Sequence, residues 1–335
     1  MIARSARSRR WRVRCLAVLA TNFPSRFYWT GGAYLRWDWL FYLVGGICLV
    51  RKDRGWLGGA FLGYAALLRL FPLLAFSGPA LVIARQLWGV RHPGHSGWTP
   101  PPVTSAGELV GRVDQRYRAL LGGAVIAFAV LVPLSLVTGN GLDGYRKFFA
   151  NTQKHAATPL TNDMGLRTVV AWKPSEVERL LRADGLDDPW VRWKQARLRT
   201  FHERAPLYWL AAAAFTALLW GALRGAEPWV ACCLGTMMIA VGVEVTCYYY
   251  AFLFAVGLLY EKREEVGAIL LAITAATGLI AWAPTKYLGN VSWWGALRVP
   301  PGLDEIYVWM SIATLLGFAW IIYSLTSTMR TTAAP

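Results

Sequence analysis

The chain has 335 residues, of which 56% are hydrophobic and 18 are tryptophan, and its mean hydropathy is +0.36. These values rarely occur together in a soluble domain and favour a membrane protein. The net charge of +16 does not indicate a nucleic-acid partner, because the basic residues lie mostly between apolar runs and the sequence has no RNA-binding motif or zinc-ligand spacing.

Residues 1–36 are interpreted as a basic stub followed by an interfacial segment. The stub is rich in arginine, and the apolar stretch "CLAVLA" that follows is too short to cross a bilayer. Residues 23–37 carry several aromatic side chains typical of a membrane interface. We interpret the stub as the end of an earlier membrane helix whose sequence would lie upstream.

The rest of the chain alternates between apolar runs and charged connections. The apolar runs are residues 37–50, 57–68, 73–84, 119–138, 206–223, 228–243, 247–260, 266–283 and 306–325. Four of them approach or reach the roughly 20 residues that a bilayer core requires. The shorter runs come in pairs, within 57–84 and 228–260, and each pair predicts a helical hairpin.

The distribution of lysine and arginine predicts the orientation of these segments. Short basic connections, including the linker 85–118, are expected on the cytoplasmic side, and the long polar segment 139–205 on the outer side. The sequence therefore predicts an all-α, multi-pass transmembrane helical bundle with short helical hairpins and a partly helical extracytoplasmic loop. Its parts are membrane helices in 37–138, the loop 139–205, and membrane helices in 206–335, and we expect it in the cell inner membrane.

Arg69 stands in the apolar stretch "AALLRLFPLLAF", at the expected tip of the first hairpin. Pro72 has no backbone N–H and is expected to end or kink the first helix. Arg69 either anchors a helix end among lipid headgroups or binds a phosphate, whose oxygens a guanidinium can grip in pairs.

The outer segment "NTQKHAATPLTNDMGLRTVVAW" concentrates polar side chains that suit a sugar-phosphate ligand. Lys154, Asn162 and Arg167 are candidate substrate-binding residues. His155 is a candidate base or donor, and Asp163 a candidate catalytic acid. A solvated loop is the alternative for each residue taken singly, and the charge-rich stretch after it predicts surface helices.

A second outer cluster is "EVTCYYY", at the expected tip of the second hairpin. Glu244 lies in an apolar run, where acidic residues are usually functional. Tyr248 and Tyr249 are either aromatic-belt residues or a surface for sugar or isoprenoid groups. Asp38, at an outer helix start, is a candidate base or the partner of a neighbouring arginine.

Several site classes are missing from the sequence. It has no glycine-rich phosphate loop, no Gly-x-Ser-x-Gly and no His-Glu-x-x-His. No cofactor is indicated. A divalent metal is compatible with the expected chemistry, but no spacing of candidate ligands indicates one. The five cysteines are interpreted as buried small side chains.

Three stretches resemble the multi-pass bacterial glycosyltransferases of the GT-C superfamily, which use polyprenyl-phosphate sugars. They are "GGAFLGYAALLRLFPLL" (58–74), "NDMGLRTVV" (162–170) and "CYYYAFLFAVGLL" (247–259), in an order that covers roughly residues 20–325. The resemblance implies a mannosyl- or arabinofuranosyltransferase-like membrane enzyme whose partners are a lipid-linked sugar donor and membrane lipids.

The resemblance also implies a catalytic acid in the first outer loop, which this sequence does not contain at the matching place. Asp38 and Asp163 are the outer acids that remain. The alternatives are a transporter or flippase-like protein for a lipid-linked sugar, and a non-catalytic fragment of a glycosyltransferase.

Overall fold

The structure is a computed structural model that describes residues 13, 16–25, 37–91, 105–286 and 302–331. The predicted stub and most of the predicted interfacial segment lie outside the described residues, as do the middle of the linker 85–118 and most of the last outer connection.

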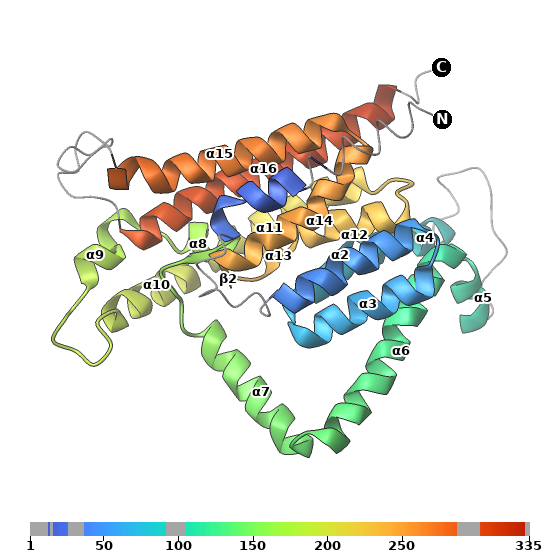
Figure 1. The fold of residues 1–335 in the computed structure, drawn as a ribbon, viewed down its shortest axis with the longest axis horizontal. Coiled ribbons are helices and arrows are strands. Elements are labelled where there is room, and N and C mark those ends of the chain that lie inside the picture. Colours follow the sequence, from blue (N-terminus) through green and yellow to red (C-terminus); the bar gives the residue numbers. More distant parts are fainter. Residues whose placement is uncertain (1–12, 14–15, 26–36, 92–104, 287–301, 332–335) are drawn as a thin grey trace. The chain divides into compact units, whose positions relative to one another are not determined.

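Helices dominate the described residues, which confirms the predicted all-α class (Figure 1). The longer helices are α2 (Asp38–Arg51), α3 (Gly55–Leu68), α4 (Ser77–Arg91), α6 (Gln115–Thr138), α7 (Gly141–Ala156), α10 (Val191–Glu203), α11 (Ala205–Ala222), α12 (Pro228–Thr236), α15 (Glu264–Lys286) and α16 (Leu303–Thr331). The short helices are η1 (Phe23–Ser25), η4 (Phe71–Phe76), α5 (Ala106–Gly111), α8 (Leu166–Val170), η6 (Pro174–Glu176), α9 (Glu178–Leu181), α13 (Ile239–Gly242), η7 (Cys247–Phe252), α14 (Leu253–Gly257) and η8 (Leu258–Glu261). The strands β1 (Asp163–Met164) and β2 (Val245–Thr246) form one antiparallel pair.

Four helices are long and apolar enough to cross a membrane. They are Gln115–Thr138, Ala205–Ala222, Glu264–Ala281 and Leu303–Thr326. Each coincides within a few residues with one of the four longest predicted runs, and these lengths are what a hydrocarbon core of about 30 Å requires. The chain is therefore a multi-pass membrane protein.

The described chain divides into two compact units. The first unit comprises residues 1–34, 140–218 and 239–335, and the second comprises residues 35–139 and 219–238.

Glycine allows the helices of the second unit to approach closely. A Cβ atom added to Gly59 of α3 would lie 1.9 Å from the carbonyl oxygen of Leu120 in α6, and one added to Gly123 would lie 1.9 Å from that of Trp56. Gly46 of α2 faces Gly58 of α3 in the same way. Small residues at such positions let helix backbones touch, which is the main packing device of membrane helices.

The segment of the first predicted hairpin consists of two helices with a break between them. Helix α3 ends at Leu68, Arg69 has an extended backbone, and the 3₁₀ turn η4 leads into α4. Pro72 lies inside η4 and does not end α3, which stops four residues earlier. Arg69 is exposed, and its guanidinium donates to the Leu68 carbonyl oxygen at 3.1 Å.

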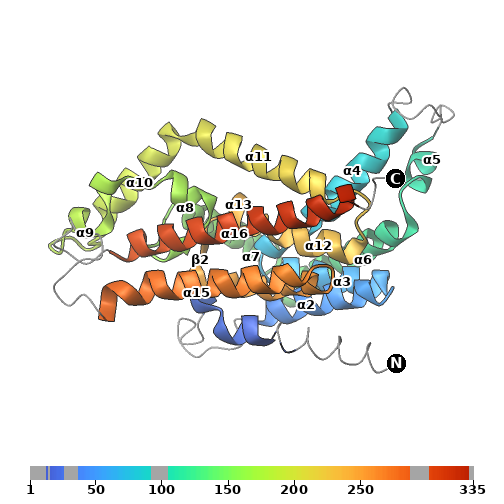
Figure 2. The ribbon, with the colours of Figure 1, turned by 90° about the horizontal axis from the view of Figure 1, so that it is seen from above.

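In the first unit, α15 and α16 run side by side (Figures 1 and 2). Gly317 of α16 lies against Ile273 of α15. Helix α16 also contacts α8 and β1. The segment that follows α7 therefore packs against this membrane helix.

The apolar runs within residues 228–260 are also separated by a break, as predicted. Glu244 follows α13, and β2 and η7 follow it before the chain resumes as α14. The β-branched residues Val245 and Thr246 occupy β2, where an extended backbone suits them.

Candidate functional site

The two-stranded ribbon joins the two polar clusters of the sequence. Asp163 pairs with Thr246, and Met164 with Val245. The amide of Cys247 donates to the Asn162 carbonyl oxygen at 2.9 Å and extends the ribbon by one residue. Residues about 80 positions apart in sequence are thereby brought together.

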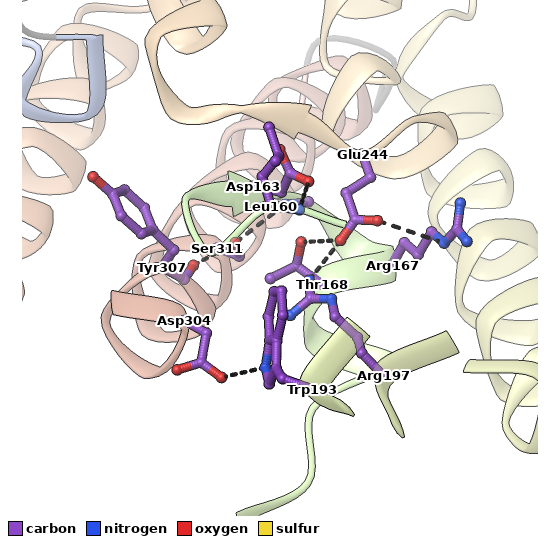
Figure 3. Close-up of polar contacts among 11 residues, drawn as sticks. Leu160, Asp163, Arg167, Thr168, Trp193, Arg197, Glu244, Asp304, Tyr307 and Ser311 are labelled. Carbon is purple, nitrogen blue, oxygen red and sulfur yellow. Dashed lines mark hydrogen bonds and ion pairs between the residues drawn. The ribbon is translucent and has the colours of Figure 1, made fainter. Parts of the chain in front are cut away.

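Glu244 is the centre of the resulting cluster (Figure 3). Its carboxylate accepts hydrogen bonds from the Thr168 hydroxyl at 2.9 Å and from the Arg197 guanidinium at 2.5 Å. The second carboxylate oxygen lies 3.6 Å from Nε of Arg167. One carboxylate thus binds two guanidinium groups. Because its single negative charge balances only one of them, the three side chains together carry a positive charge that can attract an anion.

Helix α8 presents Arg167 and Thr168 because of the glycine that precedes it. Gly165 has a φ of +133°, a conformation that other residues rarely adopt. A Cβ atom there would lie 2.9 Å from the Ala240 carbonyl oxygen. The Gly165 amide donates to the Ser311 hydroxyl of α16 at 3.1 Å, which fixes the start of α8 against a membrane helix.

Helix α10 supplies the opposite wall of the cluster. Trp193, Arg197 and Phe201 recur every four residues and therefore lie on one face of the helix. The Arg197 guanidinium carbon lies 5.3 Å from the Trp193 ring centroid, and that of Arg167 lies 4.3 Å from the Phe201 centroid. Aromatic faces attract cations, so these rings orient both guanidinium groups.

The two arginines differ in exposure, which suggests different roles. The Arg197 side chain is 5% exposed and the Arg167 side chain 23%. Arg197 is therefore a buried partner that orients Glu244, whereas Arg167 remains accessible to a ligand.

Asp163 lies on β1 next to this group and is buried. Its carboxylate accepts a hydrogen bond from the Leu160 amide at 2.8 Å. Burial, reinforced by the negative charge of Glu244, raises the pKa of Asp163 to about 7, against the opposing effect of that amide and of Arg197. A carboxyl group with such a pKa can take up or release a proton near neutral pH.

A second polar group anchors the start of α16 to the same region. The Asp304 carboxylate accepts hydrogen bonds from the Trp193 indole at 2.9 Å and from the Glu178 amide at 3.0 Å. Arg179 forms an ion pair with Glu305 at 2.8 Å. These contacts tie α9 and α10 to a membrane helix and support the wall that carries Arg197.

The structure therefore brings together some predicted site residues. Asp163, Arg167 and Glu244 share one cluster. Asn162 lies beside it, and its amide contacts the Cys247 sulfur at 3.9 Å. Tyr248 and Tyr249 follow β2 in η7 and are half-buried, with ring centroids 4.5 Å apart, and they adjoin the cluster along the chain.

The other predicted site residues belong to other elements of the chain. Lys154 and His155 are exposed near the end of α7, and neither side chain makes a hydrogen bond or ion pair with any residue that the structure describes. Asp38 begins α2, is exposed and accepts a hydrogen bond from the Trp39 amide at 2.7 Å. Asp38 and Arg69 belong to the second unit.

Sequence reasoning missed Arg197, Thr168 and the supporting residues Trp193 and Asp304. The segment that contains Arg197 was interpreted as a surface helix because it is rich in charge. Trp193 and Phe201, which lie eight residues apart on the same helix face as Arg197, were the available signal that one face is buried.

The cysteines Cys232, Cys233 and Cys247 are buried thiols, as expected, and Cys48 is partly buried. Among the residues that the structure describes, no group of three histidine, cysteine or acidic side chains is arranged to hold a metal ion. No family model matches the chain, and neither the curated proteins nor the solved structures compared with it give a match.

Proposed function

We propose that this protein is a membrane glycosyltransferase that transfers a sugar from a polyprenyl-phosphate donor to an acceptor hydroxyl on the extracytoplasmic face of the cell inner membrane. The observation that carries the proposal is the convergence of Arg167 and Arg197 on Glu244, with Asp163 beside them. Such a cluster next to membrane helices suits a ligand that has a phosphate group and a lipid chain.

Each residue of the cluster has a distinct role in the proposed reaction. Asp163 is the general base that removes the proton from the acceptor hydroxyl, for which a pKa of about 7 is well matched. The acceptor oxygen forms a bond to the anomeric carbon. The bond between that carbon and the phosphate oxygen breaks, and its electron pair leaves with the polyprenyl phosphate.

Arg167 is the group that stabilises the charge on the departing phosphate, because it is the more exposed of the two arginines. Glu244 and Arg197 are positioning residues: they hold Arg167 and the ribbon in place. Tyr248 and Tyr249 provide aromatic faces for the sugar or the isoprenoid chain. Arg69 belongs to the second unit, and its proposed role in binding the phosphate of the lipid-linked donor is tested separately.

The test uses the whole protein in membranes, incubated with radiolabelled polyprenyl-phosphate sugars, with transfer of label to an acceptor as the readout. Arg167→Ala is expected to reduce transfer by about 10²–10³-fold, the loss typical of removing one donor to a developing anion. Arg167→Lys is expected to keep part of the activity. Arg146→Ala, on the exposed face of α7, is the matched control and is expected to retain full activity.

Three results would overturn the proposal. These are no transfer from any polyprenyl-phosphate sugar, unchanged transfer by Arg167→Ala, and movement of intact lipid-linked sugar across the bilayer without cleavage of the sugar–phosphate bond. The last result would support a transporter instead. Arg69→Ala is expected to abolish transfer in the same assay, and full activity would refute a role for Arg69 in transfer.

The proposed base also predicts the pH dependence of transfer. Asp163 must be deprotonated to accept a proton, so the rate is expected to rise as pH increases through about 7. Asp163→Asn is expected to abolish the rise together with most of the activity, and a variant that keeps the wild-type pH profile would exclude Asp163 as the base.

A further inference from the structure

Helix α7 (Gly141–Ala156) has two unlike faces. Leu142, Tyr145 and Phe149 recur at spacings of three and four and form one stripe, with Phe148 beside it. We call these four residues the apolar stripe. On the opposite side of the helix Lys147 and Lys154, seven residues apart, form a cationic face.

Three of the four residues of the apolar stripe are exposed, and Tyr145 is half-buried. Leu142 is 68% and Phe149 57% exposed, and Phe148 is also largely accessible. Large apolar side chains gathered on one helix face mark a surface that binds a partner or a membrane.

The chain connection places the start of α7 close to the end of a membrane helix. No charged residue occurs between Arg118 and Asp143, so the α6 span continues to its last residue, Thr138. Only Gly139 and Asn140 separate the two helices, and each residue extends the chain by at most about 3.6 Å. Gly141, the first residue of α7, is therefore within about 11 Å of Thr138, the last residue of the α6 span.

We propose that α7 lies flat in the headgroup region of a bilayer that contains anionic lipids. The apolar stripe faces the acyl chains, and Lys147 and Lys154 reach the lipid phosphates from the polar side. A basic amphipathic helix of this kind typically buries its apolar face about 5–10 Å into the boundary between headgroups and acyl chains. This inference does not depend on the proposed transferase activity.

The test measures the depth of both faces in the full chain. A nitroxide label is attached at Phe149→Cys or, as the matched control on the opposite face, at Lys147→Cys, in a protein whose five native cysteines are replaced by alanine. The protein is reconstituted in vesicles of phosphatidylcholine and phosphatidylglycerol. Electron paramagnetic resonance then measures access of oxygen, which concentrates in lipid, and of a water-soluble nickel complex. Unchanged helical circular dichroism shows that each variant is folded.

The expected result is a high oxygen-to-nickel accessibility ratio at residue 149 and a low one at residue 147. Equal access of the nickel complex to both residues overturns the proposal, since the stripe is then in water. Shielding of residue 149 from both reagents also overturns it, because the stripe then packs against protein, such as a second copy of the chain.

The role of the cations is tested with the label at residue 149. Lys147→Gln with Lys154→Gln is expected to lower the accessibility ratio in anionic vesicles and to leave it unchanged in purely zwitterionic ones. The control double variant Arg182→Gln with Arg192→Gln removes two exposed cations from other segments and is expected to have no effect. Equal ratios for the two double variants in anionic vesicles would overturn the preference for anionic lipid.

Discussion

Arg197 is a buried cation whose side chain lies between Glu244 and the Trp193 ring. Removing one partner of a buried ion pair leaves the other charge uncompensated, which costs about 3–5 kcal/mol. We expect Arg197→Ala to lower the free energy of unfolding by an amount at the lower end of that range, because Glu244 still contacts Arg167 and Thr168 in the variant. The thermal unfolding midpoint in detergent measures the loss.

The matched control for this prediction is Arg146→Ala in α7. Arg146 pairs with Asp143, but their side chains are 80% and 72% exposed, and such pairs contribute between about 0 and 1 kcal/mol. Equal shifts of the unfolding midpoint for Arg146→Ala and Arg197→Ala would contradict a structural role for the buried pair.

Asp163 makes stability depend on pH. Its pKa is raised in the folded protein to about 7, so the folded state holds a proton that the unfolded state has already released. Stability is therefore highest at low pH and falls as pH rises between about 4 and 7. Asp163→Asn is expected to remove this fall and to stabilise the protein above neutral pH. Unfolding midpoints measured across this range test the sign, and an unchanged slope in the variant would refute it.

The candidate site could be predicted from sequence only in part. Glu244 was recognisable because an acidic residue within an apolar run is unusual, and Arg167 because it lies in a polar outer segment. Their contact was not predictable, because a two-residue ribbon between segments about 80 positions apart leaves no local pattern. His155 and Lys154 were grouped with Asp163 by closeness in sequence, but α7 ends at Ala156 and both of these side chains are exposed.

At the scale of elements, glycines determine how closely α3 and α6 pack. In Gly59→Ala the new methyl group would overlap the Leu120 carbonyl oxygen, so the helices must separate. Overpacking of this kind costs about 1–3 kcal/mol. The expected result is a lower unfolding midpoint in detergent.

Gly45→Ala is the matched control in α2. Its methyl group would lie 3.5 Å from the Phe61 ring, an ordinary contact distance. Because alanine is a better helix former than glycine by about 1 kcal/mol, this variant is expected to be neutral or slightly stabilised. Equal destabilisation of both variants would mean that close packing of α3 on α6 is not the cause.

Helices were the most predictable elements. An uninterrupted apolar run of about 20 residues has few alternatives to a membrane helix, so the four spans were located to within a few residues. Short elements were less predictable, because tertiary contacts decide them. Pro72 is an example: α3 ends before it, where Arg69 becomes extended, although proline was the evident helix breaker in the sequence.

At the scale of the whole molecule, the basic connections predict the orientation in the membrane. We expect the turn at Lys52 inside the cell and the segment around Gly185 outside. Single cysteines at Lys52 and Gly185 test this prediction: both positions are exposed or unobstructed in the structure. A membrane-impermeant maleimide is expected to label Gly185→Cys in intact cells and Lys52→Cys only after permeabilisation. Labelling of both in intact cells would contradict the orientation.

The broken apolar stretch between Pro228 and Gly257 has a consequence for how the protein is made. All of α12 is buried, as are most residues of α13 and α14. Backbone breaks at this depth are stable only where protein covers them. The ribosome releases α14 before α15, which contacts it, has been made. We therefore expect the translocon to retain the nascent chain at α14 until α15 has emerged, so that this part of the protein completes its insertion late.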